Sequence, residues 1–277
     1  MKPRVSFIDF LNSVPLGWGF LHGSHRGAFE VLFDVPSQCA EHLRTGQADI
    51  GLIPAIEYQN IPGLRILPDI SIASKREVKS VLFASRLSLK EVSRVAVDSS
   101  SRTSVALLKI VLETFHGNRS VSYTVEPPDP SRILEGYDAA LVIGNPALKI
   151  RPGPYRIHDL AAEWNRFVGL PFVFAFWAVR EDFELGEQSR IFYESRDEGL
   201  ANVEEIARIY SEKLAIPQDE IRRYIRENLS YWLGEADIRG LEEFYRLAEE
   251  IGIIEKRKPL HFLADQSREL HEYEDGA

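Results

Sequence analysis

Residues 95–108 read VAVDSSSRTSVALL, and they decide the fold because a strand passes here through a polar loop into a helix. Apolar periodicity predicts the strand at residues 95–97 and the helix at residues 105–115. One hydroxyl is enough to cap the first turn of a helix, but this loop carries five: Ser99, Ser100, Ser101, Thr103 and Ser104. The surplus hydroxyls, the free N–H groups and the positive end of the helix dipole favour an anion site. The alternative is a solvated loop with a single cap.

The same order of features occurs twice in the chain, in residues 5–54 and in residues 95–146. Each copy reads strand, polar loop, helix, strand, Pro-Ser helix, glycine, aspartate, apolar strand and proline. Strands that alternate with helices predict two similar α/β lobes with mixed, mainly parallel sheets. Ligands bind such sheets at the carboxyl ends of the strands. The loops after Phe10 and Val97, and the strand ends at Ile53 and Ile143, should therefore face one crevice between the lobes.

Two apolar stretches outside the repeat, residues 78–85 and 170–179, are predicted to cross between the lobes as a two-strand hinge. Residues 1–84 and 178–277 would then form the first lobe, and residues 85–177 the second. The alternative is that both stretches are ordinary core strands of a single lobe. From Glu181 onward the apolar spacing predicts amphipathic helices, which we expect to pack on the first lobe.

Composition excludes several classes of protein. The 277 residues carry a net charge of −9, so we expect neither nucleic acid nor an anionic membrane surface as a partner. No run approaches the ~18 apolar residues of a membrane span, and no secretory signal is visible, so we expect a cytoplasmic protein. Cys39 is the single cysteine, and the pair His22 and His25 has no third ligand nearby, so we expect no metal and no other cofactor.

Five motifs in order narrow the fold further, although none is specific alone. They are FLNSVPL at 10–16, LRTGQADIGLIP at 43–54, DSSSRTS at 98–104, ALVIGN at 140–145, and DLAAEW at 159–164 with GLPFVFA at 169–175. Together they resemble the chorismate dehydratases of the futalosine route to menaquinone, which implies the type II periplasmic-binding-protein fold. One departure is Asn145, where the resemblance leads us to expect an acidic residue.

The resemblance implies a lyase that converts chorismate, a small dianion, into 3-[(1-carboxyvinyl)oxy]benzoate and water without a cofactor. We expect Asn12 beside the reacting ring, since its amide both donates and accepts hydrogen bonds. A glycine at a strand end lets a ligand approach the backbone. The predicted substrate-binding residues are Ser13, Ser80, Ser99, Ser100, Thr103, Ser104, Gly144 and Asn145. Arg102 is a further candidate for binding a carboxylate.

Several alternatives stay open at the level of sequence. Asn12 could serve only to fix the turn before Pro15, and Ser80 could be a strand residue on a polar face. The general base is either Glu57 or the side-chain carboxylate of the substrate, with Asn12 orienting the groups. The chain could also be a non-catalytic small-anion binding protein, or the 1,4-dihydroxy-6-naphthoate synthase of the same pathway. The oligomeric state is open as well.

Overall fold

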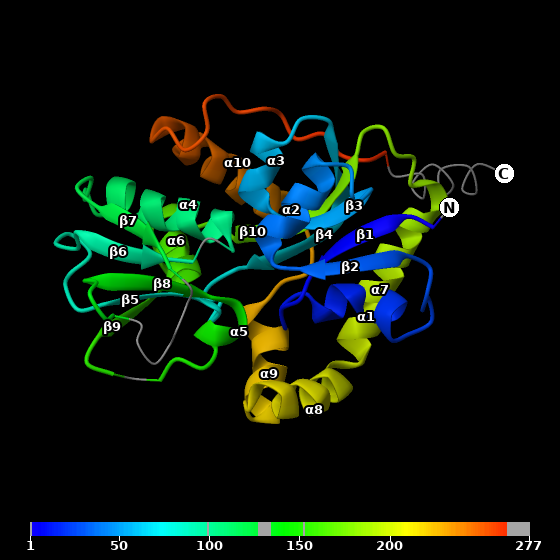
Figure 1. Ribbon diagram of the computed structural model, residues 1–277, viewed down its shortest axis with the longest axis horizontal. Coiled ribbons are helices and arrows are strands. Elements are labelled where there is room, and N and C mark those ends of the chain that lie inside the picture. The colour runs from blue at the N-terminus through cyan, green and yellow to red at the C-terminus, as the bar shows by residue number, and fades with distance from the viewer. Residues whose placement is uncertain (1, 99, 127–133, 152, 265–277) are drawn as a thin grey trace.

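The computed structural model describes residues 2–98, 100–126, 134–151 and 153–264, and two five-stranded sheets lie side by side in it (Figure 1). The first sheet has the order β2-β1-β3-β10-β4, formed by β1 (Arg4–Ile8), β2 (Glu30–Asp34), β3 (Ile50–Pro54), β4 (Leu64–Ser74) and β10 (Phe172–Arg180). The second has the order β7-β6-β8-β5-β9, formed by β5 (Val81–Ser85), β6 (Arg94–Val97), β7 (Ser122–Val125), β8 (Ala139–Ile143) and β9 (Arg156–Asp159).

The predicted repeat is confirmed by the strand order. In the first sheet β1 is parallel to β2 and β3, and in the second β6 is parallel to β7 and β8. The connecting helices are α1 (Val14–Leu21) and α2 (Pro36–Arg44) in the first copy, and α4 (Arg102–Ile110) with the π-helix η1 (Val111–Phe115) in the second. The Pro-Ser helix predicted for the second copy would begin at Pro130, which lies outside the described residues.

Both sheets are mixed, and antiparallel pairs are as frequent in them as parallel ones. Strand β10 is antiparallel to β3 and β4, and β5 is antiparallel to β8 and β9. The prediction of mainly parallel sheets took account only of the repeated βαβ units. It missed that β5 and β10, the strands that follow the two passages between the sheets, run opposite to both of their neighbours.

The chain passes between the sheets earlier than the predicted boundaries. Because β5 pairs with β8 and β9, residues 81–84 lie in the second sheet, although we expected them in the first lobe. Because β10 pairs with β3 and β4, residues 172–177 lie in the first sheet. The passages are therefore residues 75–80 and residues 160–171. Their ends at the first sheet lie side by side, since Ser74 pairs with Phe172. Apolar pattern alone could not tell which sheet two fully buried strands would join.

Short helices follow the strands whose carboxyl ends approach one another. They are α3 (Ala55–Asn60) after β3, α5 (Gly144–Ala147) after β8, and α6 (Leu160–Val168) after β9. The segments that follow β1 and β8 meet where the Leu11 N–H donates to the Asn145 side chain, and those that follow β3 and β6 meet where the Ile56 N–H donates to Thr103, as the sequence predicted. Across the described ranges, no helix is both long and apolar enough to cross a membrane.

The C-terminal segment contacts both halves of the molecule (Figure 1). It consists of η2 (Gly186–Gln188), α7 (Ser189–Ala201), α8 (Val203–Leu214), α9 (Gln218–Arg223), the π-helix η3 (Tyr224–Asn228) and α10 (Glu235–Glu250). Helix α7 packs on α1, where the Gly19 N–H donates to the Ser195 hydroxyl at 2.8 Å. Phe244 of α10 contacts Trp164 of α6 edge to face. The segment therefore bridges the two sheets, whereas we expected it to pack on the first alone.

Candidate active site

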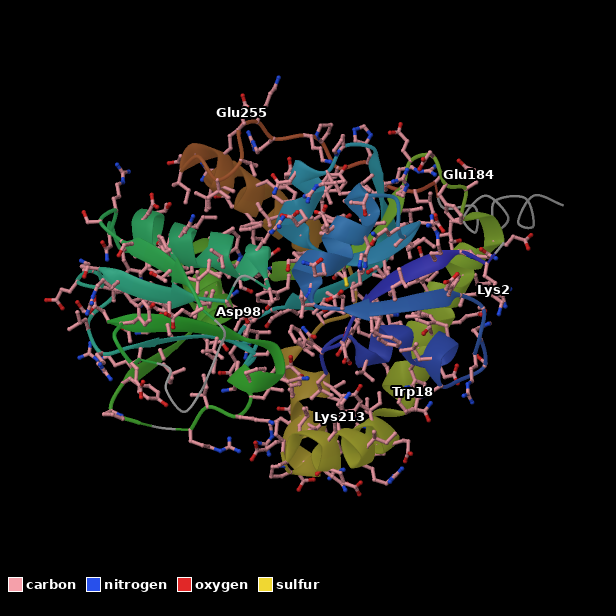
Figure 2. The ribbon with its side chains drawn as sticks, viewed as in Figure 1. Lys2, Trp18, Asp98, Glu184, Lys213 and Glu255 are labelled. Atoms are coloured by element: carbon pink, nitrogen blue, oxygen red, sulfur yellow. The ribbon has the colours of Figure 1, made fainter. Side chains whose placement is uncertain are left out.

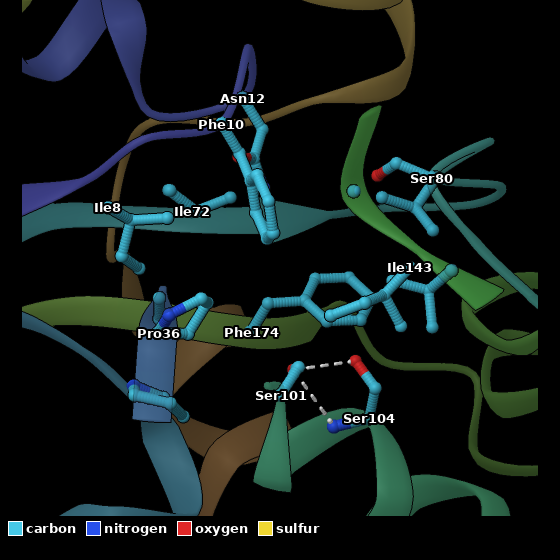
Figure 3. Close-up of a pocket in the computed structure, with 15 residues that line it drawn as sticks. Ile8, Phe10, Asn12, Pro36, Ile72, Ser80, Ser101, Ser104, Ile143 and Phe174 are labelled. Atoms are coloured by element: carbon cyan, nitrogen blue, oxygen red, sulfur yellow. Dashed lines mark hydrogen bonds between the residues drawn. The ribbon is translucent and has the colours of Figure 1, made fainter. Parts of the chain in front are cut away.

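A cavity of about 40 Å³ lies between the carboxyl ends of the two sheets (Figure 3). Its polar lining consists of Asn12, Ser80, Ser101 and Ser104, and the remaining lining is apolar. Figure 3 shows Ser101 and Ser104 on one side and Asn12 and Ser80 on the other, with aromatic rings between them. No titratable side chain is among the described residues that line the cavity. Any ligand here would meet hydroxyl and amide groups but no protein acid or base.

The first side of the cavity is the N-terminus of α4. Ser101 is the N-cap residue, and its hydroxyl lies 2.9 Å from the Ser104 hydroxyl and 3.5 Å from the Ser104 backbone nitrogen. Upstream, the Asp98 carboxylate accepts the Ser100 N–H at 2.8 Å and fixes the turn at the end of β6, where Figure 2 labels it. The hydroxyl-rich loop therefore offers two hydroxyls to the cavity at the positive end of a helix dipole.

The other predicted hydroxyls of this loop do not line the cavity. Thr103 accepts the Ile56 N–H at 3.1 Å, so it caps α3 from the opposite half of the molecule. The Ser100 carbonyl accepts the Ser37 N–H at 2.9 Å, and Ser99 lies outside the described residues. Sequence reasoning passed over Ser101 as a site residue because it predicted the helix to begin at residue 105, whereas α4 begins at Arg102 and Ser101 is its N-cap.

The second side begins at the loop after β1. The side-chain oxygen of Asn12 is shielded from solvent and has no hydrogen-bond partner among the described groups. A buried amide oxygen without a partner is costly, and this one belongs to a residue that lines the cavity. Ser13 has a different place, because its hydroxyl lies within hydrogen-bond distance of the carbonyls of Ile8 and Phe10 and so fixes the turn. Asn12 therefore lines the cavity and Ser13 does not.

Ser80 and Gly144 lie together at the entrance to the second sheet. The Gly144 N–H donates to the Ser80 carbonyl at 2.8 Å, and both residues line the cavity. Gly144 has φ +63°, and a Cβ there would lie 2.9 Å from the Phe10 ring. An alanine would therefore be strained and would also crowd the ring. The glycine lets Phe10 of the first half pack against the backbone of the second.

Asn145, which we predicted to bind substrate, instead joins the two halves. Its side-chain oxygen accepts the Leu11 N–H at 3.0 Å, and it does not line the cavity. Arg102 also bridges the halves, because its guanidinium lies 2.9 Å from the Glu57 carboxylate. Glu57 is fully buried and pairs with Arg44 as well, at 2.8 Å. With both charges engaged in this way, neither residue reaches the cavity.

These contacts define a closed arrangement. Thr103, Ser100, Asn145 and Arg102 of the second half each contact the first half directly. A cavity of about 40 Å³ is far below the ~300–1,000 Å³ of small-molecule sites. A small-molecule ligand of ordinary size therefore needs the two halves to separate before it can enter.

The histidine pair of the sequence has no role at this cavity. His25 lies 2.6 Å from the Glu194 carboxylate, and His22 packs on the Trp18 ring. Burial lowers the pKa of His22, with a further contribution from the charge of Arg26. Within the part of the chain that the structure describes, no group of three or more His, Cys, Asp or Glu side chains could hold a metal ion.

The arrangement of helix-start hydroxyls, an unpartnered amide and a wall free of charge matches a site for a small organic anion. A sequence model of a family described as menaquinone biosynthesis matches residues 3–250, which include all four polar lining residues. The chain belongs to this family.

Two proteins with a stated activity are similar in sequence to this chain. The chorismate dehydratase of Thermus thermophilus is 30% identical over 91% of this chain and 97% of that protein. The chorismate dehydratase of Campylobacter jejuni is 29% identical over 61% of this chain and 63% of that protein. The resemblance carried by the five motifs is thereby confirmed.

Solved structures confirm the fold class. A protein of Archaeoglobus fulgidus has a TM-score of 0.75 at 20% identity and covers 91% of this chain and 98% of its own. The periplasmic aliphatic sulphonate binding protein of Escherichia coli has a TM-score of 0.60 at 15% identity and covers 95% and 94%. At these identities the likeness concerns the fold, which is the periplasmic-binding-protein fold predicted for this member of the menaquinone biosynthesis family.

Proposed function

We propose that this chain is a chorismate dehydratase, a lyase that converts chorismate into 3-[(1-carboxyvinyl)oxy]benzoate and water. The observation that carries the proposal is the cavity lined by hydroxyl and amide groups but by no titratable side chain. Chorismate has two carboxylates and one hydroxyl, so it supplies all the charge and needs donors from the protein. Family membership and the two dehydratase relatives support the same activity.

In this proposal the N-terminus of α4 receives the ring carboxylate. The pair Ser101 and Ser104 donates to it through the hydroxyl proton that their mutual hydrogen bond leaves free, and the helix dipole adds a favourable field. Asn12 and Ser80, on the opposite side, contact the ether side chain and the departing hydroxyl. Phe10 and Phe174 cover the apolar part of the ring. Gly144 lets the backbone of the second half lie close to the Phe10 ring, while Asn145 and Thr103 hold the two halves together.

The reaction itself is an elimination that needs one proton acceptor. A proton leaves the ring carbon that bears the ether, the electron pair of that C–H bond forms the new ring double bond, and hydroxide leaves the neighbouring carbon. Since Glu57 pairs with two arginines and does not line the cavity, the substrate's side-chain carboxylate accepts the proton and Asn12 orients it. Proton and hydroxide leave as water, and the ring becomes aromatic.

Negative charge that develops during the elimination spreads onto the conjugated ring carboxylate. Preorganised donors at the point where charge develops stabilise a transition state more than a ground state. Ser101 and Ser104 would supply this stabilisation, and closure of the two halves would exclude water from it. The cytoplasmic location expected from the sequence stays a prediction.

The test is to incubate the purified chain with chorismate and to separate the products by chromatography. We expect an aromatic enolpyruvyl ether in the wild type and a fall of about 100-fold or more in kcat for Asn12→Ala, as for the loss of one aligned polar group. Asn165→Ala makes the same chemical change on α6, away from the cavity, and should leave turnover intact. Unchanged chorismate with measurable binding would favour a binding protein, and full turnover by Asn12→Ala would remove the role given to Asn12.

A further inference from the structure

The hydroxyl of Ser80 has a partner that comes from the far end of the sequence. Tyr224, the first residue of η3, places its phenolic oxygen 2.8 Å from the Ser80 side-chain oxygen. Both residues are buried, with exposures of 4% for Tyr224 and 1% for Ser80. Ser80 also lines the cavity, whereas Tyr224 does not. The tyrosine therefore contacts the candidate site only through the serine.

The direction of this hydrogen bond decides what Ser80 offers to a ligand. A serine hydroxyl has one proton and two lone pairs, and a phenol is the more acidic donor of the two. Burial raises the pKa of Tyr224, so the phenol keeps its proton. When Tyr224 donates to the Ser80 oxygen, the proton of Ser80 remains free to point into the cavity. A hydroxyl that accepts one hydrogen bond also becomes a stronger donor of the next.

The backbone around Ser80 is fixed independently of the tyrosine. The Val78 and Lys79 N–H groups donate to the Asp159 carboxylate, at 3.0 Å and 2.7 Å to the same oxygen, and Lys79 has φ +65°. The Ser80 carbonyl accepts the Gly144 N–H at 2.8 Å. The peptide chain thus holds the serine in place, and the tyrosine is left to set the rotation of its hydroxyl.

We propose that Tyr224 is a positioning residue that orients the Ser80 hydroxyl as a hydrogen-bond donor to the bound substrate. The proposal rests on the proposed function and deepens it, because it gives the C-terminal segment a part in binding. Removal of the phenolic oxygen would leave Ser80 free to turn its proton away from the cavity. The loss of this orientation should lower kcat/KM for the substrate, while the thermal midpoint of the chain should show that the fold stays intact.

The chain supplies a matched control in Tyr231. This tyrosine is also buried, at 1% exposure, lies in the same C-terminal segment, and its hydroxyl has no hydrogen-bond partner among the described groups. Tyr231→Phe and Tyr224→Phe remove the same atom from similar surroundings. The two variants differ in whether a bond to Ser80 is lost.

The experiment is a double-mutant cycle on the full chain, read as kcat and KM for chorismate. Tyr224→Phe should lower kcat/KM about 5- to 10-fold, within the span of about 2- to 12-fold that one neutral hydrogen bond corresponds to, while Tyr231→Phe should change it less than about 2-fold. In the Ser80→Ala background, the further change Tyr224→Phe should also have less than about a 2-fold effect. Thermal midpoints measured in parallel would show that all variants fold.

Two results would overturn the inference while the proposed function stands. One is wild-type activity in Tyr224→Phe, and the other is an equal loss from Tyr224→Phe with and without the Ser80 hydroxyl. If the wild type binds chorismate without converting it, the proposed function fails, and the same cycle is read as the dissociation constant from calorimetry. A wild-type chain that neither binds nor converts chorismate would overturn both.

Discussion

Replacement of Asn145 by alanine should weaken the closed arrangement of the two halves. The Asn145 amide oxygen accepts the N–H of Leu11, a fully buried residue, at 3.0 Å. A neutral hydrogen bond contributes about 0.5–1.5 kcal/mol net, and a donor left buried without a partner costs about 1–3 kcal/mol. In the open form water can take the place of the amide. The closed form should therefore lose roughly 1–2 kcal/mol relative to the open form, which corresponds to a factor of about 5–30 in their ratio.

Two measurements report this change. The first is kcat/KM for chorismate, which should fall by up to about 30-fold in Asn145→Ala if catalysis needs closure. The second is small-angle X-ray scattering of the unliganded chain, where a larger open fraction raises the radius of gyration. Asn145→Asp is the matched variant, because a carboxylate also accepts the Leu11 N–H and gives the stronger, charge-assisted bond. If Asn145→Ala keeps both the scattering and the kcat/KM of the wild type, Asn145 does not hold the halves together.

Two further predictions concern stability. Gly144→Ala should lower the free energy of unfolding by about 1–2 kcal/mol more than Gly117→Ala. Both glycines have φ near +65°, but of the two only Gly144 would bring its Cβ against another residue, Phe10. Equal losses of unfolding free energy in urea would contradict this. The pKa of Glu163 is held below its usual value, chiefly by the hydrogen bond from His158. Its contribution to stability is therefore complete above the usual glutamate pKa of about 4.3 and is lost as the pH falls through the lowered value. Glu163→Gln should lower the thermal midpoint at pH 7, with the difference from the wild type shrinking below pH 4; a constant difference would be evidence against the pairing.

The fold could be predicted well because its information is local and occurs twice. The strand end predicted at Ile143 is the last residue of β8, and the two copies give the same strand order. The passages between the sheets could not be placed in the same way. Strands β5 and β10 are buried on both faces and read as continuous apolar runs, so their pattern carries no record of the sheet they join.

The sequence predicted which loop forms the site, but it predicted less well which side chains of that loop line the cavity. Five hydroxyls follow β6 within seven residues, and which of them faces the cavity depends on how α4 is rotated against α3. That rotation is set by contacts between distant segments, such as the Thr103 hydroxyl on the Ile56 N–H. Tyr224 lies 144 residues from Ser80, and its spacing marked only the apolar face of a helix. Contacts of this kind leave no periodic signal in a single sequence.

The strand order also constrains the sequence of events during synthesis on the ribosome. The second sheet is made from one uninterrupted stretch, β5 to β9, and can be completed as soon as that stretch has emerged. The first sheet lacks the strand between β3 and β4 until β10 has been synthesised. Unpaired strand edges invite pairing with other chains. The half of the molecule that is translated first is therefore finished last, and a nascent chain stalled before Phe172 would be the form most prone to aggregate.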